Sequence, residues 1–339
     1  MPNDAAYSDR LILHRLYLLR YEAGVAKRMV TAYDEAFADI TAELAKLQAR
    51  IDAGTSIDLA TRNRLAGKLV QLDKEIIALN SSLASTLTDS LTETAEAEMR
   101  MHAAAARSIG LSWTAVPMEA VEAMISSPIG QRAPLGTLAV DLYEARTQIQ
   151  EILGRAMAMG SSMQDAAKFL RDASGVQETY RNRMIVIART EIQRVANDVA
   201  LATYAENSDV IEAVEWLATL DSRTCLVCAA LHGKVYPLVN GKPVGMLRAP
   251  PIHPRDRCFL APQTRSWAAL GLAPVGHVET KGASGPTFEQ WLRRQDAETQ
   301  DDVMGVERAD LWRARKLSLD KFSDQGRLLN LGELRVRYD

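Results

Sequence analysis

The chain has 339 residues, of which 47% are apolar and 24% are charged, and its formal net charge is −3 at pH 7. This length suffices for two or three domains with cores of their own, and the near-neutral charge excludes a global field that would draw the whole molecule onto nucleic acid or membrane. The start of the chain is polar and unlike a signal peptide, no run of 18 apolar residues is present, and three cysteines cannot form a complete disulfide framework. We therefore expect a protein that is made and kept in a cytosol-like, reducing compartment.

Residues 9–109 contain no proline and carry two long apolar stripes, one over residues 16–47 and one over residues 65–91. Steps of three and four residues place each stripe along one face of a helix, and residues 52–56 between them have turn composition. The pattern predicts a long antiparallel helical hairpin over residues 1–110. Because the stripe is narrow, the hairpin either forms a self-contained bundle or rests on another subunit or chain, with self-association of these helices as one form of the latter.

Three prolines and three glycines gather in residues 110–137, which predicts a linker with short helical pieces. Residues 138–157 are expected to be helical, and residues 111–150 are grouped as a linker and connecting helix. A further helix is predicted to begin at Ser161 or Ser162, which suit an N-cap, and to end just before Gly175. Another helix follows over residues 181–206, where apolar residues share one face.

Residues 210–220 roughly alternate in polarity and are predicted to form a strand with an irregularity near Val214. Short strands are expected at 234–238 and 257–260, so residues 151–270 are predicted to form a small α+β module. Residues 271–286 have the composition of a flexible connector, in which His277 is expected to be exposed, and Thr287 with Gln290 fits a capping box that starts a helix. Residues 271–339 are therefore predicted to be a linker and a helical C-terminal extension. The predicted fold class is mainly α with a small α+β module.

All three cysteines lie between residues 225 and 258, the first two as a C-x-x-C pair. Two thiolates from one tight turn can reach a single tetrahedral ion, and a distant histidine and cysteine complete the Cys₃His set typical of structural zinc. The predicted ligands are Cys225, Cys228, His253 and Cys258, and the alternative is that three apolar thiols are simply buried. Four ligands close the coordination shell, which argues for a role in folding rather than catalysis, and we expect the segment to lose order when the metal is removed.

Basic residues concentrate around these cysteines, since residues 223–265 hold seven of them against Asp256 alone. Such a patch can contact phosphates or can be merely solvated, and both interpretations stay open at this point. Aromatic residues near the patch are few, namely Tyr236, Phe259 and Trp267, so a nucleic-acid contact is expected to be phosphate-dominated and sequence-blind. The candidate phosphate contacts are Arg223, Lys234, Arg248, Arg255, Arg257 and Arg265.

Four short motifs follow one another in a specific order: ARTE at 188–191, EWLATLDSRTCLVC at 215–228, LHGKVY at 231–236 and PPIHP at 250–254. Together they resemble the phage Mu F-like minor head protein family, the head morphogenesis proteins of tailed phages, over residues 150–265. Members of that family commonly close with two cysteines, as HPxCRC, whereas here Asp256 stands at the first of them. The resemblance leaves open whether His253 or Asp256 is the fourth ligand, and imidazole is the usual partner of two or three thiolates on zinc.

The resemblance implies a minor capsid protein that acts in head morphogenesis. Its expected location is the virion, at the portal vertex or in the head interior, and the host cytoplasm during assembly. The implied partners are the portal protein and the major capsid or scaffolding protein, with packaged DNA as a further candidate and no membrane. A part in DNA packaging, delivery or ejection would follow from that position. The N-terminal hairpin lies outside the matched region and suits docking on the portal ring or on a neighbouring copy.

Two other functional classes compete with this interpretation. An enzyme such as a toxin-like ADP-ribosyltransferase or nuclease would need a further domain, and the chain has no HExxH, GxSxG, Walker or GxGxxG motif. Glu96 and Glu98 have the spacing of an acidic pair but are expected to be exposed on an alanine-rich helix, and His14 and His102 are expected to be structural. We predict no catalytic residue, no organic cofactor and a structural zinc; the main alternative is a sequence-nonspecific DNA-binding protein with a zinc knuckle.

Overall fold

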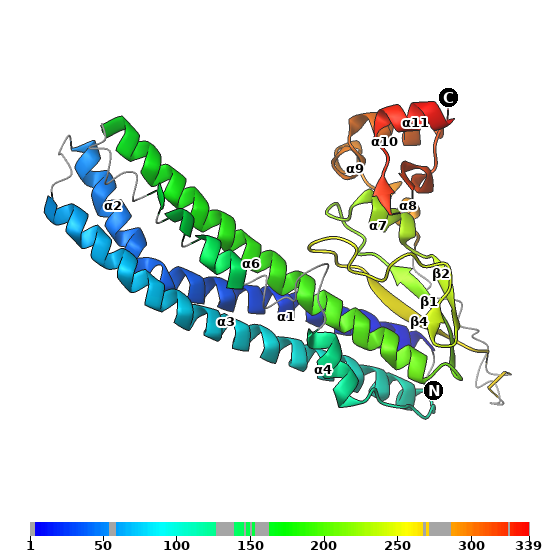
Figure 1. Ribbon diagram of the computed structural model, residues 1–339. Coiled ribbons are helices and arrows are strands. Elements are labelled where there is room, and N and C mark those ends of the chain that lie inside the picture. Colours follow the sequence, from blue (N-terminus) through cyan, green and yellow to red (C-terminus); the bar gives the residue numbers. More distant parts are fainter. Residues whose placement is uncertain are drawn as a thin grey trace. The chain divides into compact units, whose positions relative to one another are not determined.

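The computed structural model describes residues 4–53, 59–126, 139–145, 147–149, 151–152, 163–266, 269–270, 286–324 and 326–338. Most of these residues are helical, and a small antiparallel sheet lies within residues 211–264, so the predicted fold class is confirmed (Figure 1). Ser161, Ser162, Trp267, His277 and nearly all of the predicted connector lie outside the described residues. No helix in the described ranges is both long and apolar enough to cross a bilayer.

The helices are α1 (Asp4–Ala36), α2 (Ala38–Asp52), α3 (Leu59–Ser108), α4 (Met118–Ser126), α6 (Met163–Glu206), α7 (Leu226–Leu231), α8 (Phe288–Leu292), α9 (Ala297–Met304), α10 (Val306–Arg313) and α11 (Leu331–Tyr338), with one 3₁₀ turn, η1 (Leu319–Phe322). The strands are β1 (Ile211–Leu217), β2 (Val235–Val239), β3 (Lys242–Pro243), β4 (Phe259–Thr264), β5 (Ser323–Asp324) and β6 (Arg327–Leu328).

The chain forms two compact units. Unit 1 comprises Met1–Leu19, Thr94–Met124 and Gln193–Asp339, and unit 2 comprises Arg20–Glu93 and Ile125–Ile192. The long helices α1, α3 and α6 contribute residues to both units. Neither unit therefore corresponds to one continuous stretch of the sequence.

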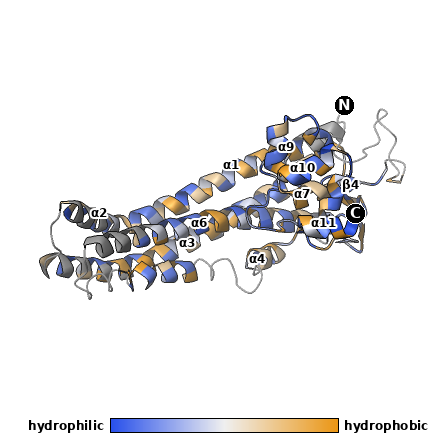
Figure 2. Ribbon diagram, turned by 90° about the horizontal axis from the view of Figure 1, so that it is seen from above, coloured by the Kyte–Doolittle hydropathy of each residue, from blue (hydrophilic) through white to orange (hydrophobic). Residues whose placement is uncertain are grey.

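In unit 2, α1 and α2 run antiparallel to α3, as the hairpin prediction requires. Arg28 Nη2 donates to Ser90 Oγ at 3.3 Å, and farther along the pair Arg64 Nε donates to Glu43 Oε2 at 3.1 Å. Figure 2 shows apolar and hydrophilic residues interspersed along the long helices. The described members of the second apolar stripe are buried, as predicted: Leu72, Ile76, Leu79, Leu83, Leu87 and Leu91.

Helix α6 gives this hairpin a packing partner within the same chain. Arg181 Nε on α6 lies 3.1 Å from both carboxylate oxygens of Asp34 on α1. The prediction that the helix ends before Gly175 is wrong, because α6 continues through that residue. An interior glycine costs a helix only about 1 kcal/mol, and the burial of Ala173 and Tyr180 on either side of it outweighs that cost.

The first apolar stripe is displaced at its N-terminal end, in unit 1. Leu16 was expected in this stripe but is 46% exposed, whereas Leu11, Arg15 and Leu18 are buried. Arg15 takes the inward position because its Nη2 donates to the carbonyl oxygen of Cys258 at 3.0 Å. A pattern of apolar residues cannot reveal a stripe in which one inward position is an arginine.

The sheet of unit 1 has the strand order β3-β2-β1-β4, with antiparallel pairing throughout. The three predicted strands are present, and the irregularity expected near Val214 lies between Ile211 and Ala213 in the pairing of β1 with β4. Nearly all of β1 is buried. Strand β4 lies at one edge of the sheet, and the carbonyl of its Leu260 accepts a hydrogen bond at 3.0 Å from the buried hydroxyl of Tyr204 on α6.

Gly241, in the turn between β2 and β3, lies directly against α6. It has φ of +72°, and a Cβ at this position would lie 2.8 Å from the Cβ of Ala205. Gly245 is the matched control, because it has φ of +82° but no heavy atom within 4 Å of its Cβ position. We expect Gly245→Ala to cost about 1–2 kcal/mol for the left-handed backbone, and Gly241→Ala to cost a further ~1–3 kcal/mol for overpacking. Urea unfolding followed by circular dichroism measures both, and equal costs would contradict the close approach.

Three titratable side chains from α1 and α3 meet inside unit 1. His14 Nε2 lies 3.2 Å from Glu98 Oε1, and His102 Nε2 lies 3.4 Å from Glu98 Oε2. Burial opposes the ionisation of Glu98, but hydrogen bonds with His102 and His14 outweigh it and hold the pKa of Glu98 at about 2. The prediction that Glu98 is exposed is therefore wrong, because the residue shares the inward face of α3 with the buried Ala95.

Residues 286–324 and 326–338 form a C-terminal module within unit 1. The predicted capping box is confirmed at its start: Thr287 Oγ1 accepts from the backbone N–H of Gln290 at 3.1 Å, and Gln290 Oε1 accepts from that of Thr287 at 3.0 Å. The module has its own hydrophobic core, which includes the fully buried rings of Phe288, Trp312 and Phe322. The predicted C-terminal extension is thus a packed structure rather than a loose tail.

Candidate metal centre

Two stretches of backbone bring the three cysteines and His253 together in unit 1. Cys225 is the N-cap of α7, and its Sγ accepts from the backbone N–H of Cys228 at 3.4 Å. His253 and Asp256 lie in the loop that connects β3 to β4, and Cys258 immediately precedes β4. The two stretches are far apart in the sequence, and the antiparallel pairing of β1 with β2 and β4 brings them close together in space.

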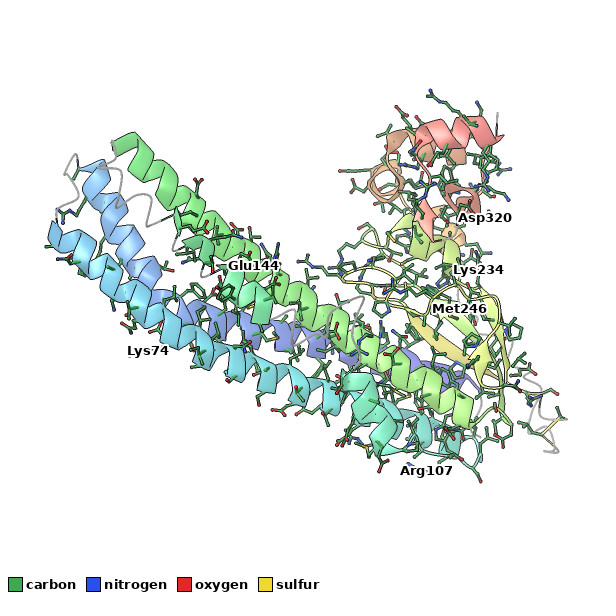
Figure 3. All side chains as sticks on the ribbon, viewed as in Figure 1. Lys74, Arg107, Glu144, Lys234, Met246 and Asp320 are labelled. Atoms are coloured by element: carbon green, nitrogen blue, oxygen red, sulfur yellow. The ribbon has the colours of Figure 1, made fainter. Side chains whose placement is uncertain are left out.

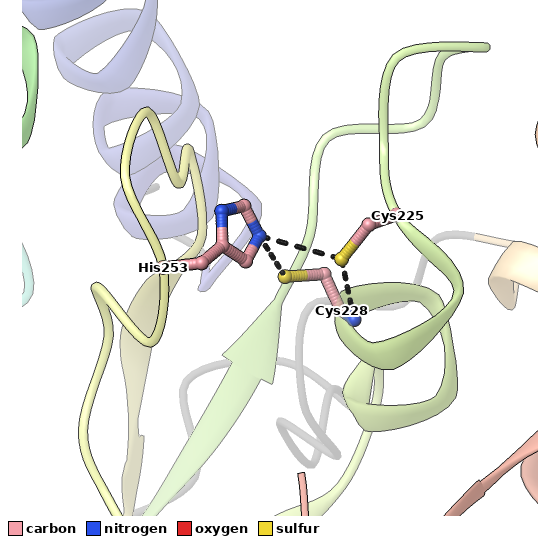
Figure 4. Close-up of side chains that lie close together, drawn as sticks. All are labelled: Cys225, Cys228 and His253. Atoms are coloured by element: carbon pink, nitrogen blue, oxygen red, sulfur yellow. Dashed lines mark hydrogen bonds between the residues drawn. The ribbon is translucent and has the colours of Figure 1, made fainter. Parts of the chain in front are cut away.

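The imidazole of His253 points at the two sulfur atoms of the C-x-x-C pair (Figure 4). Its Nε2 lies 3.3 Å from Cys225 Sγ and 3.2 Å from Cys228 Sγ. In a tetrahedral zinc site, bonds of about 2.3 Å to sulfur and about 2.0 Å to nitrogen place such atoms about 3.5 Å apart. The observed separations are close to that value, so these three side chains fit a tetrahedral ion.

Cys228 also belongs to a second group, with Asp256 and Cys258, in which the ligand atoms lie within 4.8 Å of one another. The two groups share Cys228, so all four predicted ligands and Asp256 gather around one sulfur atom. Cys228 and Cys258 are buried, and Cys225 is partly buried. The structure therefore gives two overlapping groups of three residues, either of which could hold a metal: Cys225 and His253 belong to the first, Asp256 and Cys258 belong to the second, and Cys228 belongs to both.

The imidazole of His253 is oriented so that Nδ1 faces a backbone carbonyl and Nε2 faces the cysteines. Its Nδ1 lies 2.9 Å from the carbonyl oxygen of Pro254, which can only accept a hydrogen bond, so Nδ1 carries the proton. Nε2 faces the two sulfur atoms, and its lone pair becomes available to a metal once Nε2 releases its own proton. A backbone carbonyl that orients the imidazole in this way is the usual second partner of a ligating histidine.

Asp256 has a different environment, although it lies next to the cluster. Its Oδ2 accepts from the backbone N–H of Ile252 at 2.8 Å, and its Oδ1 accepts from that of Cys258 at 2.8 Å. Both carboxylate oxygens of this buried side chain thus bind the backbone of the loop that carries His253. These bonds give Asp256 a part in shaping the loop, and its Oδ1 also lies 3.7 Å from Cys228 Sγ.

The cluster shifts the pKa values of its members in opposite directions. Hydrogen bonds with Cys228 and His253 lower the pKa of Cys225 to about 4, and the hydrogen bond with Cys225 raises the pKa of His253 to about 9. Hydrogen bonding to Cys225 raises the pKa of Cys228, and burial raises that of Cys258. At neutral pH a metal must therefore displace protons from His253, Cys228 and Cys258, whereas Cys225 is already suited to bind as a thiolate.

The backbone around Cys258 is held by two side chains that the sequence did not single out. Its carbonyl oxygen accepts from Arg15 Nη2 at 3.0 Å and from Asn197 Nδ2 at 3.1 Å. A third missed residue is Asp221, whose two oxygens each accept from the guanidinium of Arg257 at 2.6 Å. Asp221 belongs to the motif that contains the C-x-x-C pair, so its position in the sequence could have indicated a role near the cysteines. Nothing in the sequence around Arg15 indicates a contact with residue 258.

The Asp221 pair changes the interpretation of the basic patch. Arg257 is 17% exposed at its side chain and is engaged with a carboxylate inside the protein, so we remove it from the candidate phosphate contacts. Arg223 lies 3.4 Å from the same carboxylate but is 77% exposed. Asp221 lies just outside residues 223–265, so its negative charge was not included when the basic and acidic residues of the patch were compared.

The remaining candidates lie at exposed positions. Lys234 and Arg248 line one cleft of about 410 Å³, which Asp320 and Asp324 of the C-terminal module also line; Lys234 and Asp320 are labelled in Figure 3. Arg265 is exposed and donates to a backbone carbonyl at 3.2 Å. Arg255 is exposed as well. The structure thus brings Lys234 and Arg248 together.

Residues 147–261 match the model of a family described as Phage Mu protein F like protein. The match covers the described part of α6, the sheet almost to its end, α7 and every member of the cysteine cluster. It confirms the family resemblance found in the motifs. Comparison with curated proteins and with solved structures gives no match.

Proposed function

Residues 147–261 of this chain match the Phage Mu protein F like family, and from that premise we propose that the protein is a minor capsid component of a tailed phage that acts in head morphogenesis. The observation that carries the proposal is the family match across α6, the sheet and the cysteine cluster. The finer proposal is a position at the portal vertex or in the head interior, with the portal protein and the major capsid or scaffolding protein as partners. From that position the protein would also take part in DNA packaging or delivery.

The proposed role of the cysteine cluster is structural. Cys225, Cys228, His253 and Cys258 would hold zinc, and the bound ion would supply a cross-link between the C-x-x-C turn and the loop before β4. Four protein ligands leave no position for a substrate or an activated water. A non-enzymatic function follows, in which the domain serves as a building block.

An exposed apolar face on α1 supports contact with other head proteins. Ile12, Leu13, Leu16 and Tyr17 are 48%, 65%, 46% and 49% exposed, and their spacing places them on two adjacent turns of one helical face. Large apolar side chains clustered in this way are typical of protein interaction sites. We assign this face to docking on the portal or on a neighbouring copy.

The test measures incorporation of the protein into heads. In cells infected with phage that lack their own copy of the gene, Leu13→Ser/Leu16→Ser/Tyr17→Ser is expected to lower the number of copies per purified head by at least about tenfold, because each exposed apolar anchor contributes to docking. The control is Val70→Ser/Ile77→Ser, which changes exposed apolar residues of α3 in unit 2. Quantitative mass spectrometry of purified heads gives the copy number. Absence of the wild-type protein from heads would refute the proposed function, and equal incorporation of the two variants would refute the docking face.

Contact with packaged DNA is the second candidate function. No aspartate or glutamate occurs between residues 222 and 255, while Lys234, Lys242 and Arg248 are exposed there. We expect a random-sequence duplex to bind with an affinity that falls steeply with salt, and Lys234→Gln/Arg248→Gln to weaken it, whereas Arg294→Gln at another exposed position leaves it unchanged. Fluorescence anisotropy over a range of salt concentrations measures this. Binding that is absent, or unaffected by salt, removes the candidate.

A further inference from the structure

The short helix α7 lies between two hydrophobic cores of unit 1. Cys228 belongs to the core of the sheet, together with Trp216 and Cys258. Leu226 and Ala229, on the other side of the same helix, belong to the core of the C-terminal module. The six residues of α7 therefore carry one proposed metal ligand, Cys228, towards one core and apolar contacts towards the other.

Of the described helices and strands outside the C-terminal module, α7 makes the main contacts with it. Elements η1, α8, β5 and β6 all pack against α7. Leu220, just before the cysteine pair, adds a partly buried contact with the same core. The docking of the module on the rest of unit 1 thus depends on where α7 is held.

A helix of six residues has little stability of its own, because isolated helices shorter than about 12 residues are marginal in water. The flanks of α7 are tied to the sheet region by the Asp221–Arg257 pair and by His232 Nδ1, which accepts from the backbone N–H of Ala218 at 3.0 Å. Between those flanks, α7 contacts the core of the sheet through Cys228 and the partly buried Leu231, and of these two side chains only Cys228 would be held by a bound metal. Orientation of the helix accordingly depends on what the cysteines bind.

The opposite side of the cluster has support that needs no metal. Asp256 binds two backbone N–H groups of its loop, and Arg15 and Asn197 hold the carbonyl of Cys258. Loss of a metal would leave the loop and β4 in place and would release α7 alone. The two sides of the site thus differ in how much they depend on the ion.

We propose that metal binding at Cys225 and Cys228 is a latch that docks the C-terminal module on the Mu F-like domain. With the ion bound, α7 presents Leu226 and Ala229 to the core that contains Phe288 and Trp312. When the ion leaves, the module undocks while the sheet and α6 keep their structure. The proposal rests on the proposed zinc site and goes beyond the proposed function, since it holds whatever the partner of the module in the head is.

Hydrogen exchange on the full-length protein tests the latch. Mass spectrometry compares zinc-loaded protein, chelator-treated protein shown to be metal-free by elemental analysis, and the latter after addition of zinc or, as a control, magnesium. We expect exchange in α8, α10 and η1 to become at least about tenfold faster in the metal-free protein, which corresponds to about 1.4 kcal/mol of local opening free energy, and to recover with zinc but not with magnesium. Exchange in β1, β4 and α6 is expected to stay the same.

Three variants separate the latch from general loss of structure. Cys225→Ser is expected to lose zinc and to show the fast exchange in the module. Leu226→Ser is expected to keep zinc and still show the fast exchange, because it removes the apolar contact and no ligand. Asp209→Ala, at an exposed position outside α7 and the cysteine cluster, is expected to behave like the wild type. A metal-free protein whose module stays fully protected, a module that loses protection only together with β1 and β4, or a purified protein that binds no zinc would each overturn the proposal.

Discussion

Replacement of Asp256 by alanine is expected to destabilise unit 1 by roughly 2–6 kcal/mol and to weaken zinc binding. The side chain is 1% exposed and accepts from the backbone N–H groups of Ile252 and Cys258, both at 2.8 Å. Each buried donor left without an acceptor costs about 1–3 kcal/mol. The loop between these two residues also carries His253, so its loss of shape would misplace a proposed ligand.

Asp256→Asn serves as an intermediate variant, because an amide retains one acceptor oxygen and loses the other. Its cost should fall between that of the wild type and that of Asp256→Ala. The exposed Asp209 is the matched control, and Asp209→Ala is expected to change stability by no more than about 0.5 kcal/mol. Urea unfolding and zinc content by elemental analysis measure the two effects. Wild-type stability and full zinc content in Asp256→Ala would show that the loop does not depend on this carboxylate.

The second large effect is expected in unit 2, where Leu83→Ala should cost about 2–5 kcal/mol. Leu83 is 0% exposed and lies in the buried apolar stripe of α3, which is one arm of the helical hairpin. Truncation removes buried methyl groups and leaves a cavity that a packed helical core closes only in part.

Ile77 provides the control on the same helix, because its side chain is 71% exposed. Ile77→Ala is expected to change stability by no more than about 0.5 kcal/mol. Thermal unfolding followed by circular dichroism compares the two variants. Similar costs for both would mean that the stripe of α3 does not face the core in the way described here.

Local signals in the sequence predicted local structure well. The capping box at Thr287 and Gln290 depends on atoms three residues apart, and the stripe from Leu72 to Leu91 depends on the helical repeat, so both could be read without any knowledge of the fold. The cysteine cluster was predictable for a related reason. Residues that can bind zinc are few, chemically distinctive and characteristically spaced, so their positions in the chain indicate that they can meet.

The errors share a different cause. The end of a helix before Gly175, the exposure of Glu98 and the inward place given to Leu16 were all inferred from the residues themselves. The helix continues through Gly175 because residues on either side of it are buried, and the other two expectations were overturned by a partner far away in the chain. Glu98 faces His14, and Arg15 displaces Leu16 from the seam because it reaches Cys258, 243 residues away. A buried arginine or glutamate is paired as a rule, but the sequence does not state with which residue.

The amino-acid sequence by itself determined the helical stripes, the strands around the cysteines, the candidate ligands and the resemblance to the Mu F-like family, because periodicity, caps and motif order are properties of short stretches of chain. Only the tertiary structure decided that His253 turns its Nε2 to the sulfur atoms while Asp256 binds the backbone, and that α7 joins the cysteine cluster to the C-terminal core. These outcomes depend on the packing of elements that are distant in the chain. Long-range contacts of that kind are selected by the burial of whole faces and the pairing of buried polar groups, and no single stretch of sequence contains that information.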